Sequence, residues 1–428
     1  MKKILVSITA AALMASSAMA SDKGVDLVTT GQAVVFYNTV ATNASGANSQ
    51  DLFGNAASDN TRANGGLQLN LDADLKNGFT LGSQINYLTT LGLEKNLVNG
   101  TMQSVNGTNT NGIVENNIAD DIYLSKIFIA KKIANTTLKI GRQELPKSLS
   151  PFAYSEGWNV FKNTFDAVLA INSDIPDTTL VGAYVAKTNG DGFGNNMSSF
   201  NDLSVNNHPI TGAGGAPING AIYMLTVQNS SLPMTTITAS YYDLAKIQVA
   251  SNEGASIAWA NVAIADKSLP MGLNFGIQGG SITPEASALK DTSAYGVKVG
   301  LTPMKNLTLG VAYTSVDDGS VQIRNAGGVK TPLYTQMIAD QNAIAIDNDT
   351  FLLSASYNTG DYGSVILRGT STTDNSDAKR DYTDIELLYK VKVGAVDLLA
   401  VYMTQAWSEK VATVDAQNIA RVVARYHF

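Results

Sequence analysis

Apolar and polar residues alternate along most of this chain, position by position. Between positions 67 and 75 every second residue is Leu or Ala, and the residues between them are Gln68, Asn70, Asp72 and Asp74. A period of two places successive side chains on opposite faces of an extended strand. The pattern therefore predicts β-strands, each with one apolar and one polar face.

About eighteen segments show this alternation, each bounded by residues that favour turns, with ends set to within about 2 to 4 residues. They lie at 25–38, 62–76, 78–90, 121–133, 136–142, 163–172, 178–188, 218–229, 235–249, 254–265, 271–282, 292–302, 305–316, 349–358, 361–373, 382–393, 395–406 and 419–428.

The connections between these segments are of two kinds. Those that follow even-numbered segments are short turns, such as Asn77 and Gly394. Most of those that follow odd-numbered segments are long and polar, such as 91–120 and 317–348, although the link near 250–253 is short. Short turns at one end and long loops at the other are typical of outer-membrane β-barrels. An even number of strands places both chain ends at the short-turn end.

A closed barrel explains these segments better than a soluble sandwich does. After Ala20 the sequence lacks the ~18 to 20 uninterrupted apolar residues of a transmembrane helix. Open twisted sheets rarely exceed ~10 strands, and hairpin order without Greek-key jumps closes into an up-and-down barrel. We therefore expect an all-β fold, a single antiparallel transmembrane barrel of about 16 to 18 strands formed by residues 21–428. Its apolar faces would contact lipid and its polar faces would line water.

The N-terminus predicts export. Lys2 and Lys3 precede an apolar run that ends in Ala-Met-Ala at 18–20, an order typical of a secretory signal peptide over residues 1–20. The chain has no cysteine, so an exported domain of this size would be held together by hydrogen bonding and packing rather than by disulfides.

The last segment also alternates, and it ends in Tyr426 and Phe428. This ending resembles the terminal signature of outer-membrane barrels that their assembly machinery recognises. We therefore expect the chain to lie in the bacterial outer membrane, surrounded by the lipid bilayer and lipopolysaccharide.

Two motifs stand on either side of one long loop. Residues 138–146 read Leu-Lys-Ile-Gly-Arg-Gln-Glu-Leu-Pro, and residues 158–167 read Trp-Asn-Val-Phe-Lys-Asn-Thr-Phe-Asp-Ala. They resemble motifs of the OprD-like outer-membrane porin family and of the related major outer-membrane proteins of Campylobacter-type bacteria. The resemblance implies that the loop at 143–162 folds inward and narrows a pore. It also implies passive diffusion of small polar solutes and ions, through a monomer or a homotrimer.

The chain departs from that family in the middle of the loop. Family members specific for carboxylates often have an Arg there, opposite a ladder of basic residues across the pore, whereas this sequence has Glu156-Gly157-Trp158. Lys147 and Lys162 are the only cations of the loop. The resemblance therefore does not extend to carboxylate specificity.

Charged residues on the polar faces are candidates for lining the pore, because charged rings and pore width set selectivity. Arg142 lies on the same strand face as Leu138 and Ile140, which should contact lipid, so we expect Arg142 at the rim or on a strand end that bends inward. A lipid-facing Arg costs about 2–4 kcal/mol at the bilayer midplane but ~0–1 kcal/mol near the interface. The candidate constriction residues are Lys139, Arg142, Glu144, Lys147, Glu156, Lys162 and Asp166. The candidate wall residues are Asp72, Asp74, Lys298, Asp384, Glu386, Lys390, Lys392, Asp397, Arg421 and Arg425.

Other classes of function have weaker support. The formal net charge of −7 argues against a general nucleic-acid binder. With only His208 and His427 and no cysteine, the sequence indicates no metal cluster, no hydrolase triad, no cofactor and no enzyme. One alternative stays open, an outer-membrane adhesin or structural barrel whose lumen is plugged and whose long loops bind partners.

Overall fold

The alternating segments form antiparallel strands, as the sequence predicts. The computed structural model describes residues 25–44, 50–54, 59–105, 120–190, 192–205, 216–217, 221–248, 253–377, 379–411 and 414–428. The barrel strands are β1 (Asp26–Ala44), β2 (Asn60–Lys76), β3 (Phe79–Thr89), β4 (Asp121–Ile133), β5 (Thr136–Gln143), β6 (Phe165–Asn172), β7 (Thr178–Thr188), β11 (Ile222–Asn229), β12 (Thr235–Gln248), β13 (Glu253–Ala265), β14 (Asn274–Pro284), β15 (Thr292–Met304), β16 (Leu307–Val316), β17 (Asn348–Asn358), β18 (Ser364–Asp374), β19 (Tyr382–Val393), β20 (Val396–Val411) and β21 (Val414–His427).

The remaining elements are short. They are β8 (Asn201–Asp202), β9 (Ser204–Val205), β10 (Ala216–Pro217) and three single-turn helices, η1 (Leu93–Lys95), η2 (Pro270–Gly272) and η3 (Gly360–Tyr362). Among the described residues, no helix has the length and apolarity needed to cross a membrane.

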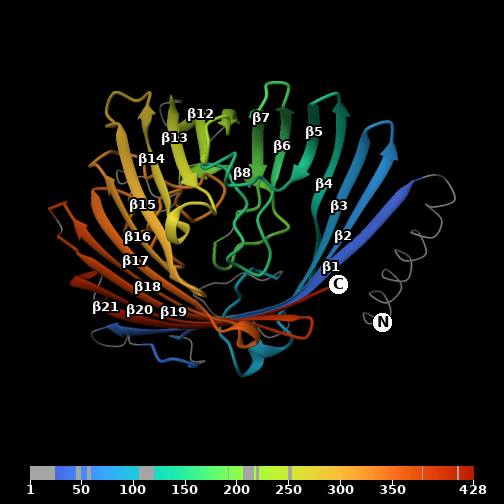
Figure 1. Ribbon diagram of the computed structural model, residues 1–428. Helices are drawn as coiled ribbons and strands as arrows, with labels where there is room; N and C mark the ends of the chain where they lie inside the picture. Colours follow the sequence, from blue (N-terminus) through green and yellow to red (C-terminus); the bar gives the residue numbers. More distant parts are fainter. Residues whose placement is uncertain are drawn as a thin grey trace.

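The predicted all-β barrel of eighteen strands is confirmed. Each strand pairs with its neighbours in chain order, and the ring closes because β1 pairs with β2 on one edge and with β21 on the other (Figure 1). The main chains of Gly31 and Phe428 exchange two hydrogen bonds at this seam, 2.8 and 3.1 Å long. The expected signal peptide at 1–20, and His208, lie outside the described residues.

Most strand ends lie within a few residues of the predicted ones. The exceptions are β1, which continues to Ala44 rather than 38, and the last hairpin, in which both strands are longer than predicted. The strand β20 continues to Val411 and β21 begins at Val414, whereas the alternation places these ends near 406 and 419. The pairing register shifts between Ala406 and Val411. Such a shift breaks the strict alternation of faces while main-chain pairing continues, so the pattern underestimates the length of this hairpin.

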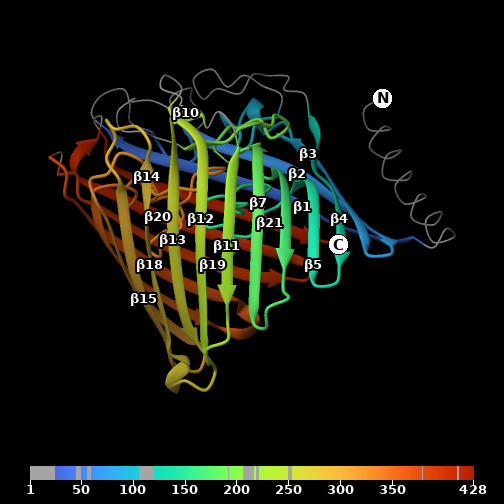
Figure 2. The same cartoon turned by 90° about the horizontal axis from the view of Figure 1, so that it is seen from above.

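The two kinds of connection lie at opposite ends of the barrel (Figure 2). The turn between β2 and β3 is tight because Asn77 and Gly78 both adopt positive φ angles, 51° and 78°. Asn and Gly tolerate this left-handed conformation, which matches the twist of a two-residue hairpin.

The outer face of the barrel is apolar, as expected. Ile277 on β14 is 60% exposed whereas the next residue, Gln278, is 3% exposed and points inward. Leu353 on β17 is 56% exposed and its neighbour Leu352 is buried. An exposed apolar band around a closed sheet suits contact with hydrocarbon.

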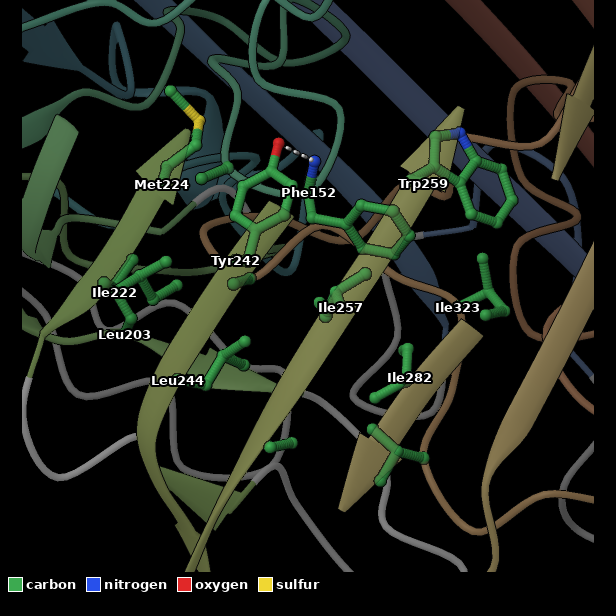
Figure 3. Close-up of a cluster of buried hydrophobic side chains, with 14 of the residues drawn as sticks. Phe152, Leu203, Ile222, Met224, Tyr242, Leu244, Ile257, Trp259, Ile282 and Ile323 are labelled. Carbon is green, nitrogen blue, oxygen red and sulfur yellow. Dashed lines mark hydrogen bonds between the residues drawn. The ribbon is translucent and has the colours of Figure 1, made fainter. Parts of the chain in front are cut away.

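The inner face is not polar throughout, which corrects the expectation that it lines water everywhere. On β6, β7 and β11 to β14 the inward side chains are largely apolar and buried, among them Leu169, Met224, Ile257 and Trp259. They form one hydrophobic cluster with residues of the inward-folded loops, such as Phe152 and Ile323 (Figure 3). One side of the barrel interior is therefore filled by packing.

The outward face can be tested by placing a charge on it. We expect Leu353→Arg to lower the free energy of unfolding in lipid vesicles by about 2–4 kcal/mol, because the side chain would lie near mid-strand in hydrocarbon. Ser364→Arg, which points into the lumen, should have a much smaller effect. Equal unfolding free energies for the two variants in urea titrations would contradict an outer face in lipid.

Candidate pore constriction

The loop between β5 and β6, residues 144–164, folds into the barrel and is anchored on its apolar side. The main-chain N–H of Phe152 donates a hydrogen bond of 3.2 Å to the hydroxyl of Tyr242 on β12. The Phe152 ring packs edge-on against Tyr242 and against Trp259 on β13, with centroids 5.7 and 5.3 Å apart (Figure 3). Such aromatic contacts add to the stability gained from burial. The start of the loop is thus fixed to β12 and β13.

The other end of the loop is held from the opposite wall. Arg425 on β21 donates hydrogen bonds to the main-chain carbonyls of Asn159 and Val160, at 2.7 and 2.9 Å. Gln103, in the loop between β3 and β4, exchanges two hydrogen bonds with the main chain of Phe161, at 2.7 and 3.0 Å. The loop therefore crosses the lumen with both ends attached.

A second long loop, residues 317–347 between β16 and β17, also enters the lumen and packs against the first. Glu156 is buried at their contact and its carboxylate accepts hydrogen bonds from the main-chain N–H groups of Val329 and Lys330. The same carboxylate accepts one from Trp158 and one from Asn325, at 3.0 and 2.8 Å. Glu156 was expected to face the pore, but the structure shows that it joins the two loops.

The second loop is fixed to the wall by Glu386, one of two acidic residues on β19 that were expected to line the pore. Glu386 on β19 is fully buried, pairs with Arg368 on β18 and accepts the main-chain N–H of Ile338. Asp384 is also fully buried and accepts a 3.1 Å hydrogen bond from Gln405. Both carboxylates point inward as expected, but both are buried and do not line open space. Glu386 holds the loop directly, and Gln405, the partner of Asp384, donates a 3.3 Å hydrogen bond to the loop carbonyl of Ala339.

Two cavities meet at the tip of the constriction loop. One, of about 1010 Å³, extends along β18 to β21 toward the short turns. The other, of about 530 Å³, lies along β1 to β4. Gly157 and Arg425 line both cavities. A third cavity, of about 440 Å³, lies at the long-loop end beside Asp347 and Trp407. The loop tip at Gly157 thus lies between the two larger cavities.

The larger cavity has a mainly cationic lining. Its basic residues are Arg368, Lys390, Lys392, Arg421 and Arg425, and its acidic residues are Asp361 and Asp397. The carboxylate of Glu386 neutralises Arg368, whereas Lys390 and Lys392 are exposed to the cavity. We call this lining the cationic wall.

Arg421 in the cationic wall is almost fully buried and positions aromatic rings. Its Nε donates a 3.0 Å hydrogen bond to Asn38. Its guanidinium lies over the rings of Phe36 and Trp158, 5.2 and 5.7 Å from their centroids. Trp158 follows Gly157, so this cation–π contact fixes the orientation of the loop tip against the wall.

The base of the constriction loop carries an ion-paired carboxylate. Glu144 contacts Lys126 on β4 at 2.6 Å and Lys162 at the far end of the loop at 2.8 Å. Burial by itself would raise the pKa of Glu144, but the two lysines hold it below its ordinary value. Glu144 and Lys162 were both predicted, and both line the 530 Å³ cavity.

Lys147 lies inside the lumen and donates to the carbonyl of Thr331 at 3.1 Å. Lys147 is exposed within the lumen, and desolvation by the surrounding protein lowers its pKa to about 8. Lys139 and Lys298 also point inward and lie over the rings of Phe128 and Tyr334, 3.7 and 4.3 Å from the centroids.

The two acidic residues expected on the wall near β2 take different positions. Asp72 lines the 530 Å³ cavity. Asp74 shares its face but lies nearer the short turns and pairs with Lys76 at 3.6 Å. Among the described residues, no group of His, Asp and Glu has the arrangement needed to hold a metal ion.

The placement of Asp166 and Arg142 at the constriction is wrong. The alternation on β6 puts Phe165, Ala167 and Leu169 on one face, and the structure turns this apolar face inward, onto the buried cluster. Asp166 therefore points outward and forms a 2.9 Å ion pair with Arg142, its cross-strand partner near the rim end of β5. Arg142 lies near the rim on the outer side, as its parity indicates, and its charge is neutralised there.

Three components of the site were missed from the sequence. Arg368 follows the exposed residue Leu367, and Lys126 precedes the exposed residue Ile127. Because successive residues of a strand point to opposite faces, the alternation alone could have placed both cations on the inner face. The inward course of 317–347 has no such local signal, because its composition resembles that of the external loops.

The closed ring, the inward-folded loops and the cavities beside the loop tip define a β-barrel with a constricted lumen. Among solved structures the chain is similar to Acinetobacter baumannii OccAB3, with 15% identity, a TM-score of 0.74, and coverage of 94% of this chain and 99% of the other. Pseudomonas aeruginosa OccK9 (OpdG) gives 15% identity, a TM-score of 0.74 and coverage of 94% and 98%. Pseudomonas aeruginosa OccK2 (OpdF), solved in complex with glucuronate, gives 14% identity and a TM-score of 0.70, with coverage of 94% of this chain and 98% of the other.

The chain thus has the fold of the Occ porins, and the fold implied by the OprD-like resemblance is confirmed. No protein-family model and no curated protein sequence matched the chain. The likeness to the Campylobacter-type proteins stays an expectation from the sequence motifs.

The contact between the two loops can be tested at Glu156. We expect Glu156→Ala to lower the free energy of unfolding by about 1–3 kcal/mol, because buried N–H donors lose their acceptor. The loop tip should also become mobile, which single-channel recordings would show as larger current fluctuations. Glu144→Gln, an acidic residue of the same loop with a water-accessible carboxylate, is the control. Unchanged stability and unchanged current noise in Glu156→Ala would contradict the role of Glu156 as a clamp.

Proposed function

We propose that this chain is an outer-membrane channel through which small polar solutes and ions diffuse passively. The observation that carries the proposal is the closed ring with polar and charged cavities inside it that adjoin the tip of the inward-folded loop at Gly157. Water-filled space lined by polar and charged groups gives a hydrated solute a route across hydrocarbon. The channel performs no chemical step.

We further propose that the channel favours anions. With Arg368 neutralised by Glu386, four cations against two carboxylates in the larger cavity still give a positive potential there, and charge in a low-dielectric passage concentrates ions of opposite sign. OccK2, which has the same fold, was solved with glucuronate, an organic anion. In this chain the cations of the larger cavity all lie on barrel strands. The middle of the loop has Glu156-Gly157-Trp158, where carboxylate-specific members of the OprD-like family often have an Arg.

The proposed route to the membrane uses both ends of the chain. The signal peptide at 1–20 would export the protein, and the last strand would be recognised by the assembly machinery. In support, Tyr426 and Phe428 are exposed on the outer face beside the seam, with their rings stacked 6.1 Å apart. The channel would function as a monomer or as a homotrimer, which cross-linking in the membrane distinguishes.

The alternative of a plugged barrel predicts a different result in planar bilayers. Purified refolded protein should give discrete, ohmic conductance steps if the lumen is open. Repeated insertion without conductance would reject the channel and favour a structural or adhesive barrel.

Charge reversal tests the anion preference. We expect Lys390→Glu combined with Lys392→Glu to shift the reversal potential in a KCl gradient from the anion side toward the cation side, because the cationic wall loses its water-exposed charges. Lys267→Glu combined with Lys305→Glu, in the short turns after β13 and β15 and outside the cavities, is the matched control and should leave the reversal potential unchanged. Identical shifts in both variants would show that the wall does not set selectivity.

A further inference from the structure

The wall beside the ion-paired base of the loop carries two rows of side-chain amides. In one row, Gln32 on β1 donates to Gln68 on β2 at 2.8 Å, and Gln68 donates to Asn86 on β3 at 3.0 Å. Asn86 then donates to the hydroxyl of Tyr123 on β4 at 3.0 Å. This row runs across the strands, around the inside of the barrel.

A second row runs beside the first. Ser125 on β4 donates to Gln84 on β3 at 2.7 Å, and Gln84 donates in turn to Asn70 on β2. Asn70 donates to Thr30 on β1 at 3.2 Å. We call the two rows together the amide wall, comprising Gln32, Gln68, Asn70, Gln84 and Asn86.

The rows fix the direction of each amide, and the two amides that are partly exposed, Gln32 and Asn70, can still bind a solute, whereas Gln68, Gln84 and Asn86 are buried and hold them in place. A side-chain amide has two N–H donors and an oxygen with two lone pairs. Within its row Gln68 uses one donor and one lone pair, and so does Asn70. Gln32 and Asn70 are partly exposed, and together with Thr30 they line the 530 Å³ cavity. The cavity thus presents oriented donors and acceptors side by side.

The amide wall adjoins the cationic wall. Arg425 donates to the Oε1 of Gln32 at 3.2 Å and lines both cavities. A solute near the loop tip therefore has the cationic wall on one side, and on the other the amides together with the ion-paired Glu144. A hydroxyl group both donates and accepts, so it can replace water at an amide, whereas a methylene displaces that water and leaves the amide unsatisfied.

We propose that the amide wall binds solute hydroxyl groups and makes the channel prefer polyhydroxylated solutes to aliphatic ones of equal charge and length. The inference rests on the proposed channel function and concerns the part of the solute that the cationic wall does not recognise. Charge would be selected at β18 to β21, and hydroxylation at β1 to β3.

The test compares two six-carbon monoanions, gluconate and hexanoate, in purified protein in planar bilayers. Reversal potentials against chloride give the permeability of each anion. We expect a gluconate-to-hexanoate ratio several-fold above that of free diffusion in the wild type. In Asn70→Leu combined with Gln84→Met, which keeps side-chain size and removes the amides, the ratio should fall several-fold while chloride conductance stays similar.

The control is Asn261→Leu, which removes an inward amide on β13 outside the two cavities and should keep the wild-type ratio. A wild-type ratio at or below that of free diffusion overturns the inference even if the double variant fails to fold. An unchanged ratio in a folded double variant also overturns it. Absence of any chloride conductance in the wild type would instead reject the channel itself, and the inference with it.

Discussion

Closure of the sheet is the constraint on which the rest of the structure depends. A strand in hydrocarbon cannot leave its main-chain N–H and C=O groups without partners, so a sheet that spans a bilayer must have no free edge. Here the first strand meets the last one, with Phe36 opposite Asn64 on one side and Val423 on the other. The ring fixes which residues point inward, and it encloses a space that the chain fills from within.

That space is divided between packing and water. On the β6 to β14 side, inward residues such as Leu169 and Ile257 bury apolar surface against the two loops that enter the lumen, which holds these loops as the core of a soluble domain would. On the β18 to β21 side, inward lysines and arginines face free space. The position of the cavities therefore follows from the distribution of apolar residues on the inner face.

The sequence predicts the strands well because alternation is a local property. The bounds of β4, β7 and β19 coincide with the predicted ones, since each face is defined by residues two positions apart. The sequence does not predict whether a strand face points inward or outward where that direction depends on packing against residues far away in the chain. Asp166 was placed inward because apolar faces were assigned to lipid, but β6 packs its apolar face on a core built by loops. Likewise, nothing near Glu156 in sequence indicates contact with Lys330, which lies 174 positions away.

The attachments of the constriction loop have a mechanical consequence. Arg425 on β21 and Tyr242 on β12 hold the same short segment, so the loop links two walls of the ring from inside. Lateral pressure from the bilayer cannot flatten the cross-section without stretching these contacts. These contacts therefore resist a change in the distance between the two walls when the thickness or tension of the membrane changes.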